Sequence, residues 1–301
     1  MKLGISSYCL DSLIQSGKLT LRAAIDWAVR QGAELLELVP FAFTFETDSG
    51  NINYDAIADV RRWAADAGIE LANYSVLADL CKDDPRELAA EIGRVKRHID
   101  IAAALGLRCM RHDISAFRRP RGQNGVAEFD RLLPQMADAA GELADHAAAC
   151  GVTTLVENHG FFVNGCDRIE RLIRAVDRPN FALLLDTGNI ACVDEIPEVG
   201  ALRLTPLAKM IHLKDFYIRR TDPGDAHDFD CAGSWFQTQA GRYLRGSILG
   251  QGDLDIVEIL SAVKHSGYDG AIAIEFEGLE EPQYATKVSL DNARRFWDSI
   301  V

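Results

Sequence analysis

The sequence has no membrane-spanning or secretory signature. None of its apolar runs approaches the roughly 18 residues that a membrane span requires. The first residues, MKLGISSYCL, lack the apolar region and small-residue cleavage site of a secretory signal. Seven cysteines are scattered along 301 residues and form no C-x-x-C pair, which is typical of reduced thiols. We therefore expect a cytoplasmic protein without membrane contact or a disulfide framework.

Basic character and nucleotide-binding signatures are also missing. The net charge is −13, whereas proteins that bind a nucleic-acid backbone normally carry a basic patch. No G-x-G-x-x-G follows the first expected strand, and no P-loop signature occurs. No linker rich in Pro or Ser divides the chain. These absences predict a single domain over residues 1–301 that acts on a small molecule and not on nucleic acid.

What the sequence does contain is a regular alternation of β-rich segments and segments with apolar residues at helical spacing. Strands are expected at residues 2–7, 34–39, 69–75, 107–112, 152–158, 181–186, 208–213 and 271–276. Helices are expected at 20–31, 54–67, 84–105, 128–150, 167–176, 195–208, 255–266 and 284–300. A glycine follows five of these helices, as at a helix C-terminus: Gly32, Gly68, Gly106, Gly151 and Gly267. Eight strand–helix pairs predict an α/β fold, a (β/α)₈ TIM barrel, with a doubly wound open sheet as the alternative.

One connection, residues 216–252, is too long for a simple barrel loop. It contains Trp235, Phe236 and Tyr243, and also His227 and several arginines that include Arg219. Long loops inside compact domains are usually functional or disordered, and the aromatic residues argue against disorder. Three interpretations stay open: a cover over the active site, a contact in a homo-oligomer, and a solvated insertion.

Four of the expected strands end in a residue type that binds metals. These residues are Glu157 in TLVENH, Asp186 in ALLLDTGN, His212 in MIHLKD and Glu275 in AIAIEFE. Polar groups at the C-terminal ends of parallel strands build the active site of a barrel. Any one of them alone could be a cap or an ion-pair partner, but several buried carboxylates repel one another unless a cation neutralises them. Three carboxylates and an imidazole suit a divalent ion, for which we expect Mn²⁺, with Mg²⁺, Co²⁺ or Zn²⁺ as alternatives.

Two further residues lie two positions beyond a candidate ligand and should face the same side of the strand. His159 follows Glu157, and its imidazole could act as a general acid or base or could orient a carboxylate. Lys214 follows His212 and could hold a substrate oxygen, stabilise an oxyanion or transfer a proton. A salt bridge from Lys214 to Asp215 or Glu277 is the structural alternative.

Other polar residues at strand ends are candidates for substrate binding. Arg111 and His112 end the fourth strand, and the alternation leaves open which of them faces inward. An arginine there could clamp a carboxylate or hydroxyl groups. Asn189 ends DTGN, and Glu37 ends the second strand. Arg219 in the long connection could serve an anionic group of the substrate. Ordinary packing at the barrel rim is an equally good interpretation of each.

Five short motifs carry a family resemblance. They are ENHG at 157–160, DTGN at 186–189, HLKD at 212–215, LGQGDLD at 249–255 and IEFEG at 274–278. With them the chain resembles the xylose isomerase-like TIM-barrel superfamily, specifically the sugar phosphate isomerase/epimerase family, over essentially its whole length. The resemblance implies a metal held by Glu157, Asp186, His212 and Glu275. It also implies a metal-dependent isomerase or epimerase that acts on a sugar, sugar phosphate or polyol derivative through an enediolate intermediate. Glu157 and Glu275 would then be acid–base residues on opposite sides of the metal.

Differences between this chain and individual branches of the family reduce the number of substrates and reactions that we expect. The ketohexose 3-epimerase branch has a histidine at the position of Asn189 and a glutamate at the position of Val163, which argues against a free ketohexose. The pair Glu157 and His159 resembles the branch that contains 3-dehydroshikimate dehydratases, in which the histidine and an arginine, here Arg111, contribute to the site. The alternative function is therefore a metal-dependent lyase or dehydratase that acts on a keto-sugar or cyclic keto acid. Three-zinc endonucleases of similar fold need more histidine ligands than this chain offers.

Overall fold

Eight parallel strands close into a barrel, as the sequence predicts. The computed structural model describes residues 1–117, 119–224 and 234–301. The barrel strands are β1 (Lys2–Ser6), β2 (Leu35–Leu38), β3 (Glu70–Val76), β4 (Cys109–His112), β5 (Thr153–Glu157), β6 (Phe181–Asp186), β7 (Ala208–Leu213) and β11 (Ala271–Ile274). Each strand pairs with its neighbours along the chain, and β1 closes the ring against β11. The closed ring excludes the open sheet.

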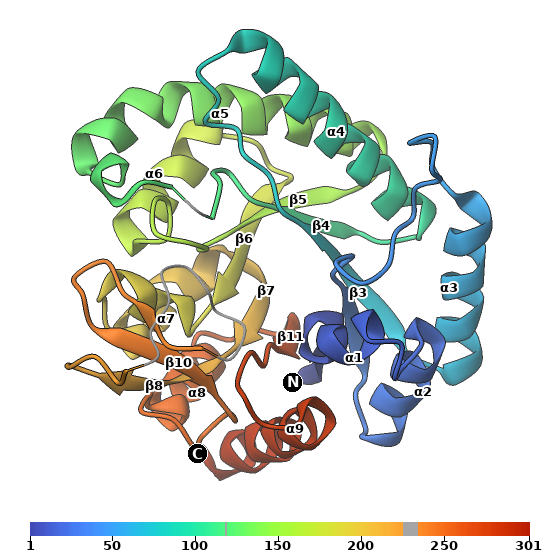
Figure 1. Cartoon of the computed structure of the whole chain (residues 1–301), viewed down its shortest axis with the longest axis vertical. Coiled ribbons are helices and arrows are strands. Elements are labelled where there is room, and N and C mark those ends of the chain that lie inside the picture. Colours follow the sequence, from blue (N-terminus) through green and yellow to red (C-terminus); the bar gives the residue numbers. More distant parts are fainter. Residues whose placement is uncertain (118, 225–233) are drawn as a thin grey trace.

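Helices surround the barrel (Figure 1). They are α1 (Asp11–Gln15), α2 (Leu21–Arg30), α3 (Tyr54–Ala67), α4 (Pro85–Ala104), α5 (Val126–Ala149), α6 (Cys166–Val176), α7 (Pro197–Leu204), α8 (Ile256–His265) and α9 (Pro282–Ser299). The five predicted terminal glycines all have positive φ, between 70° and 79°, a conformation that side chains with a Cβ rarely adopt. Among the described residues, no helix is both long and apolar enough to cross a membrane.

The barrel interior is a small apolar cluster that is separate from the larger core between strands and helices. It is made by Leu35, Leu155, Ala182, Leu184, Met210 and Ala273. Five of these side chains precede a polar residue by two positions, so the polar residue also points inward. These polar residues are Glu37, Glu157, Asp186, His212 and Glu275. The period of the strands thus places all five at the C-terminal end of the barrel, above the apolar interior.

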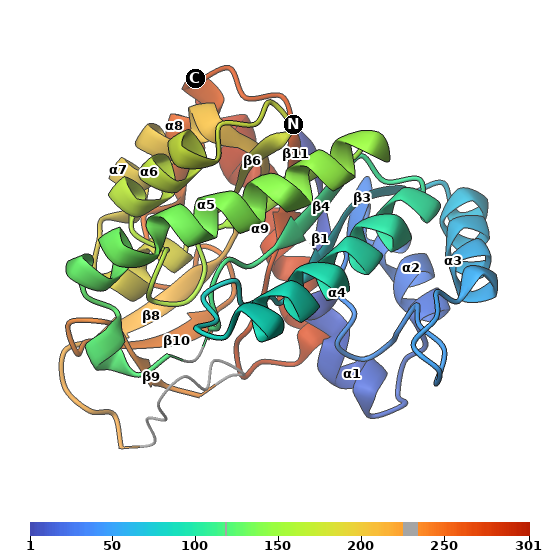
Figure 2. The ribbon, with the colours of Figure 1, turned by 90° about the horizontal axis from the view of Figure 1, so that it is seen from above.

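The connection after β7 is folded, not an irregular loop. It forms an antiparallel sheet of β8 (Asp215–Arg219), β9 (Phe236–Gln237) and β10 (Tyr243–Ser247). Figure 2 shows this sheet at the end of the barrel opposite the two termini. Phe236 is 1% exposed and packs against Phe216, which explains the aromatic content. His227, Cys231 and the rest of residues 225–233 lie outside the described residues.

The LGQGDLD motif attaches this sheet to the barrel. The buried carboxylate of Asp215 accepts hydrogen bonds from the backbone N–H groups of Gly250, Gly252 and Leu254. A Cβ atom on Gly252 would lie 2.3 Å from Asp215 Oδ1. The second glycine of the motif is therefore required by this close approach.

Candidate active site

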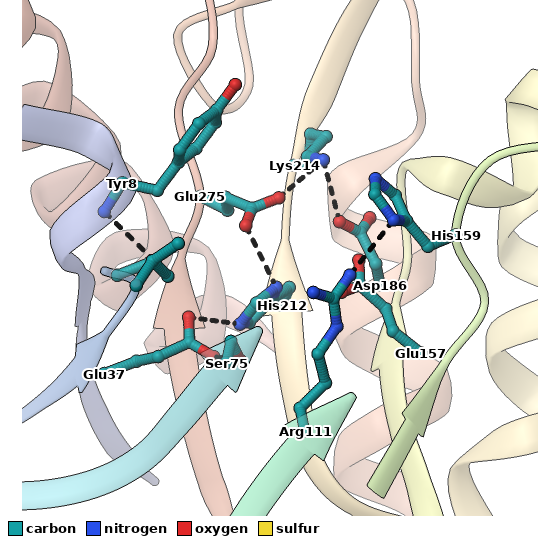
Figure 3. Close-up of polar contacts among 12 residues, drawn as sticks. Tyr8, Glu37, Ser75, Arg111, Glu157, His159, Asp186, His212, Lys214 and Glu275 are labelled. Carbon is teal, nitrogen blue, oxygen red and sulfur yellow. Dashed lines mark hydrogen bonds and ion pairs between the residues drawn. The ribbon is translucent and has the colours of Figure 1, made fainter. Parts of the chain in front are cut away.

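Four side chains from neighbouring strands converge at the C-terminal end of the barrel. Glu157, Asp186, His212 and Glu275 each offer a ligand atom, and these atoms all lie within 4.8 Å of one another. Asp186 and His212 are directly paired residues of β6 and β7. Figure 3 shows the side chains pointing toward a common centre. The structure therefore brings together the four residues that were selected from sequence.

The arrangement of hydrogen bonds leaves ligand atoms of this cluster available. Asp186 Oδ1 accepts from the backbone N–H groups of Gly188 and Asn189, both at 2.9 Å. Asp186 Oδ2 and His212 Nδ1 are buried without a well-aligned hydrogen bond, although a buried polar atom normally has one; Lys214 Nζ lies 3.0 Å from Asp186 Oδ2, and Glu275 Oε1 lies 3.5 Å from His212 Nδ1. Three carboxylates with one imidazole are a suitable donor set for a divalent ion. The residues present therefore fit a metal.

Lys214 supplies a positive charge to the same cluster. Its Nζ lies 3.0 Å from Asp186 Oδ2 and 2.5 Å from Glu275 Oε2. Burial alone would lower the pKa of Lys214, but Asp186 and Glu275 outweigh burial and raise it well above its ordinary value. In turn, Lys214 and His212 hold the pKa of Glu275 below its ordinary value despite burial. Lys214 is therefore protonated in this cluster and carries a positive charge.

Glu37 contacts the histidine of the cluster and does not line the cavity described below. Its Oε2 lies 2.8 Å from His212 Nε2, and its Oε1 accepts hydrogen bonds from Asn73 and Ser75. Burial would lower the pKa of His212, but Glu37 and Glu275 outweigh burial and raise it to about 10. With Nε2 held by Glu37, the other ring nitrogen faces Glu275. Glu37 thus orients a candidate ligand.

A second group of charged residues adjoins Glu157. Arg111 Nη2 lies 2.5 Å from Glu157 Oε2 and 2.8 Å from Asp113 Oδ1. His159 Nδ1 lies 3.1 Å from the same Asp113 oxygen, and its ring stacks on Phe117. Arg111 therefore faces inward. Its neighbour His112 faces outward, with its ring 6.3 Å from the ring of Phe181.

Asn189 bridges the two groups of charged residues. Its Nδ2 donates to Glu157 Oε1 at 2.9 Å, and its Oδ1 accepts from Lys214 Nζ at 3.2 Å. The side-chain amide therefore uses both its donor and its acceptor on functional candidates. Its backbone carbonyl accepts from Asn164 Nδ2, which fixes the loop that carries it.

A cavity of about 320 Å³ opens above the cluster. Its polar wall includes Arg111, Glu157, His159, Asn189, His212, Lys214, Glu275 and Glu277, and its apolar wall includes Val39, Phe41, Leu77, Phe117 and Phe236. Phe236 comes from the inserted sheet, so the insertion forms part of the cavity wall. Arg219, by contrast, is half exposed, pairs with Asp253 and does not line the cavity. A cavity of this size with both polar and apolar walls suits a small polar ligand.

Asp113 and Glu277 are functional candidates that sequence reasoning did not select. Glu277 lies 3.6 Å from Lys214, and burial together with Glu275 raises its pKa to about 7 although Lys214 opposes this. Its position two residues after Glu275 was a usable signal, because it predicts the same orientation. Asp113 directly follows the end of β4, where the regular alternation no longer predicts the direction of a side chain.

The whole-chain comparison identifies the family. A model described as the xylose isomerase-like TIM barrel matches residues 25–296. The chain belongs to this family. This confirms the resemblance and the fold that the motifs implied.

Similar proteins within the family include dehydratases. The chain is 30% identical over 151 residues to an inosose dehydratase of Lacticaseibacillus casei, covering 50% of this chain and 47% of that protein. It is 27% identical over 239 residues to a 3-dehydroshikimate dehydratase of Pseudomonas aeruginosa, covering 77% of this chain and 33% of that protein. The aligned region thus covers less than half of the length of each of these two dehydratases. A crystal structure of the IOLI protein with a zinc atom has a TM-score of 0.72 and 15% identity, with 98% of this chain and 96% of that chain covered.

Proposed function

We propose that the protein is a metal-dependent dehydratase that removes water from a neutral, polyhydroxylated cyclic ketone. Glu157, Asp186, His212 and Glu275 would hold the ion, with Zn²⁺, Mg²⁺ or Mn²⁺ as candidates. When bound, the ion would supply Lewis-acid polarisation of a carbonyl group. The remaining steps depend on protein side chains that transfer protons next to that carbonyl.

The proposal rests mainly on two unlike side chains in the cavity wall, the imidazole of His159 and the ammonium group of Lys214. His159 has its Nδ1 beside Asp113 and Arg111, which leaves Nε2 to exchange a proton with a substrate. On the other side, the ammonium group of Lys214 can donate to a developing oxyanion or to a departing hydroxyl group. Elimination of water needs one base for the C–H bond and one donor for the leaving oxygen, and these two unlike groups match that requirement.

The charge of the cavity supports a neutral substrate. Among the described cavity-lining residues, the arginine and lysine are Arg111 and Lys214, and both are already paired with carboxylates. A carboxylated or phosphorylated substrate would have to compete with these ion pairs. An inosose, which has only hydroxyl and carbonyl groups, would not. The similarity to inosose dehydratase points the same way.

Epimerisation is the second candidate, because it begins with the same proton abstraction. Glu157 on β5 and Glu275 after β11 approach the common centre from different strands, as a reaction with two bases requires. Each is already engaged by a cation, Glu157 by Arg111 and Glu275 by Lys214. Against the effect of burial, Lys214 holds the pKa of Glu275 below its ordinary value and makes it a weak base, whereas burial raises the pKa of Glu157 despite Arg111. Because only one of the two carboxylates is suited to accept a proton, epimerisation ranks below elimination.

Incubation of the metal-loaded protein with inososes in deuterated water separates the two reactions. We expect a product with a conjugated carbonyl, detected by ultraviolet absorption and mass loss of one water. Deuterium incorporation with an inverted centre and no loss of water would instead establish epimerisation. His159→Asn should strongly reduce the elimination, whereas Arg219→Ala, outside the cavity, should retain it. A shikimate-type keto acid should be the poorer substrate, because its carboxylate would have to compete with the ion pairs of Arg111 and Lys214.

A further inference from the structure

A second group of metal-ligand residues lies far from the cavity. Asp100 on α4 and His146 and Cys150 at the end of α5 offer three ligand atoms within 4.8 Å of one another. Cys150 precedes the first residue of β5, Thr153, by only three positions. The group therefore lies at the N-terminal end of the barrel strands, whereas the candidate active site lies at their C-terminal end.

The spacing of these residues suits a shared ion. His146 and Cys150 are four residues apart at the end of a helix, so their side chains lie on one face. His146 Nε2 lies 2.8 Å and Cys150 Sγ 3.7 Å from the same oxygen, Asp100 Oδ1. In a tetrahedral zinc site, bonds of about 2.0–2.3 Å place the ligand atoms roughly 3.5 Å apart. Small side-chain movements would therefore produce the required geometry.

An ordinary ion pair between α4 and α5 explains only part of this arrangement. One turn earlier, Lys96 on α4 pairs with Glu142 on α5 at 2.7 Å. Asp100 and His146 repeat this pairing as a second contact between the same helices. The repeat does not account for the half-buried thiol of Cys150, whose sulfur faces the same carboxylate oxygen.

The surroundings favour a cation. The C-terminal ends of α4 and α5 both lie here, and a helix C-terminus carries a partial negative charge. Burial and the neighbouring Asp100 raise the pKa of the Cys150 thiol, so the metal-free thiol keeps its proton. A divalent ion would displace that proton and form a metal–thiolate bond.

We propose that Asp100, His146 and Cys150 form a second metal site, which holds Zn²⁺ through one carboxylate oxygen, one imidazole nitrogen and one thiolate, with water as the fourth ligand. Thiolate and imidazole ligands select zinc over magnesium or calcium. Binding releases the thiol proton to solvent. The ion ties the end of α4 to the end of α5, so its effect is on stability and not on the chemistry in the cavity.

Cobalt(II) titration of the reduced, full-length protein tests this site. A Co²⁺–thiolate bond gives an ultraviolet charge-transfer band that carboxylate and imidazole ligands do not give. We expect this band in the wild type and in Glu275→Gln, which impairs the barrel site, and we expect its loss in Cys150→Ser and His146→Gln. Absence of the band from the wild type, or its persistence in Cys150→Ser, would overturn the proposal.

Alkylation provides a readout that needs no variant. Zn²⁺ should protect Cys150 of the wild type from iodoacetamide, as measured by peptide mass spectrometry, and a chelator should remove this protection. Alkylation of Cys150 at the same rate with and without Zn²⁺ would contradict the site. This measurement decides the question even if the Cys150→Ser chain fails to fold.

Discussion

Glu37 lies directly against His212, with Glu37 Oε2 2.8 Å from His212 Nε2, and neither residue reaches solvent. A carboxylate on the far side of a metal-binding imidazole fixes the ring and makes it a better ligand. The pair therefore prepares one ligand of the candidate metal site before any ion arrives. Its effect on metal affinity can be measured separately from catalysis.

Glu37→Gln should weaken metal binding by about ten- to a hundredfold, because the amide keeps the shape of the side chain but loses its charge. Competition with a chromophoric chelator measures the affinity. Glu70→Gln is a matched control at the exposed start of β3, where the carboxylate pairs only with Lys2 among the described contacts. Equal affinities of the Glu37 variant and the wild type would show that Glu37 does not act through His212.

Asp113→Asn should reduce turnover by about a hundredfold or more, because His159 loses the carboxylate that orients its ring. Metal affinity should stay within about twofold, since the described contacts of the Asp113 carboxylate are to Arg111 and His159 and, unlike those of Glu37, not to a candidate ligand. The double variant with His159→Asn should be no slower than His159→Asn alone. Additive losses would mean that the two residues act independently.

Stability should fall in mild acid because of His98, which is buried on α4 with its Nδ1 3.0 Å from Tyr74 Oη. Burial lowers the pKa of His98 to about 4 from its ordinary value of about 6.5. The unfolded chain therefore binds more protons between these values. The stabilising contribution is complete above the unfolded pKa and is lost as pH falls toward the folded pKa.

Between about pH 7 and about pH 5, this one residue should remove about 2 kcal/mol from the free energy of unfolding. Urea titrations at both pH values measure the change, and His98→Gln should show a smaller difference between them. An unchanged pH dependence in the variant would assign the acid sensitivity to other groups, among them His112, whose pKa burial also lowers to about 4.

Gly252→Ala should destabilise the protein by about 1–3 kcal/mol, because the added Cβ would overlap the Asp215 carboxylate that anchors the inserted sheet. Gly93→Ala is the matched control: it lies inside α4 with nothing within 4 Å of its added Cβ. There alanine should be stabilising by about 0.5–1 kcal/mol. Thermal unfolding compares the two, and equal stability of both variants would remove the argument for a close approach.

The alternation of the strands made the four ligand candidates predictable. Glu157, Asp186, His212 and Glu275 each end an apolar strand, and the inward direction follows from the period of two. The alternation alone does not decide between Arg111 and His112, because their directions depend on which side of β4 faces the interior. The contact between Glu37 and His212 could not be predicted in this way, because it depends on how β2 and β7 face each other across the barrel. No local pattern predicts such a contact between distant strands.

The inserted sheet was partly predictable for a related reason. Its aromatic residues indicated an ordered segment, but β9 has only two residues, Phe236 and Gln237. So short a strand carries no readable alternation. Its position depends on pairing with β10, which only the folded chain reveals.

Metal content of purified variants tests the central claim most directly. Measured in a Cys150→Ser background, which removes the proposed second site, the parent should retain one metal ion through dialysis. His212→Ala and Glu275→Gln should each lose it, while Arg219→Ala should keep it. Stoichiometric metal in both the His212→Ala and the Glu275→Gln proteins would contradict the assignment of the four strand-end residues as a metal centre.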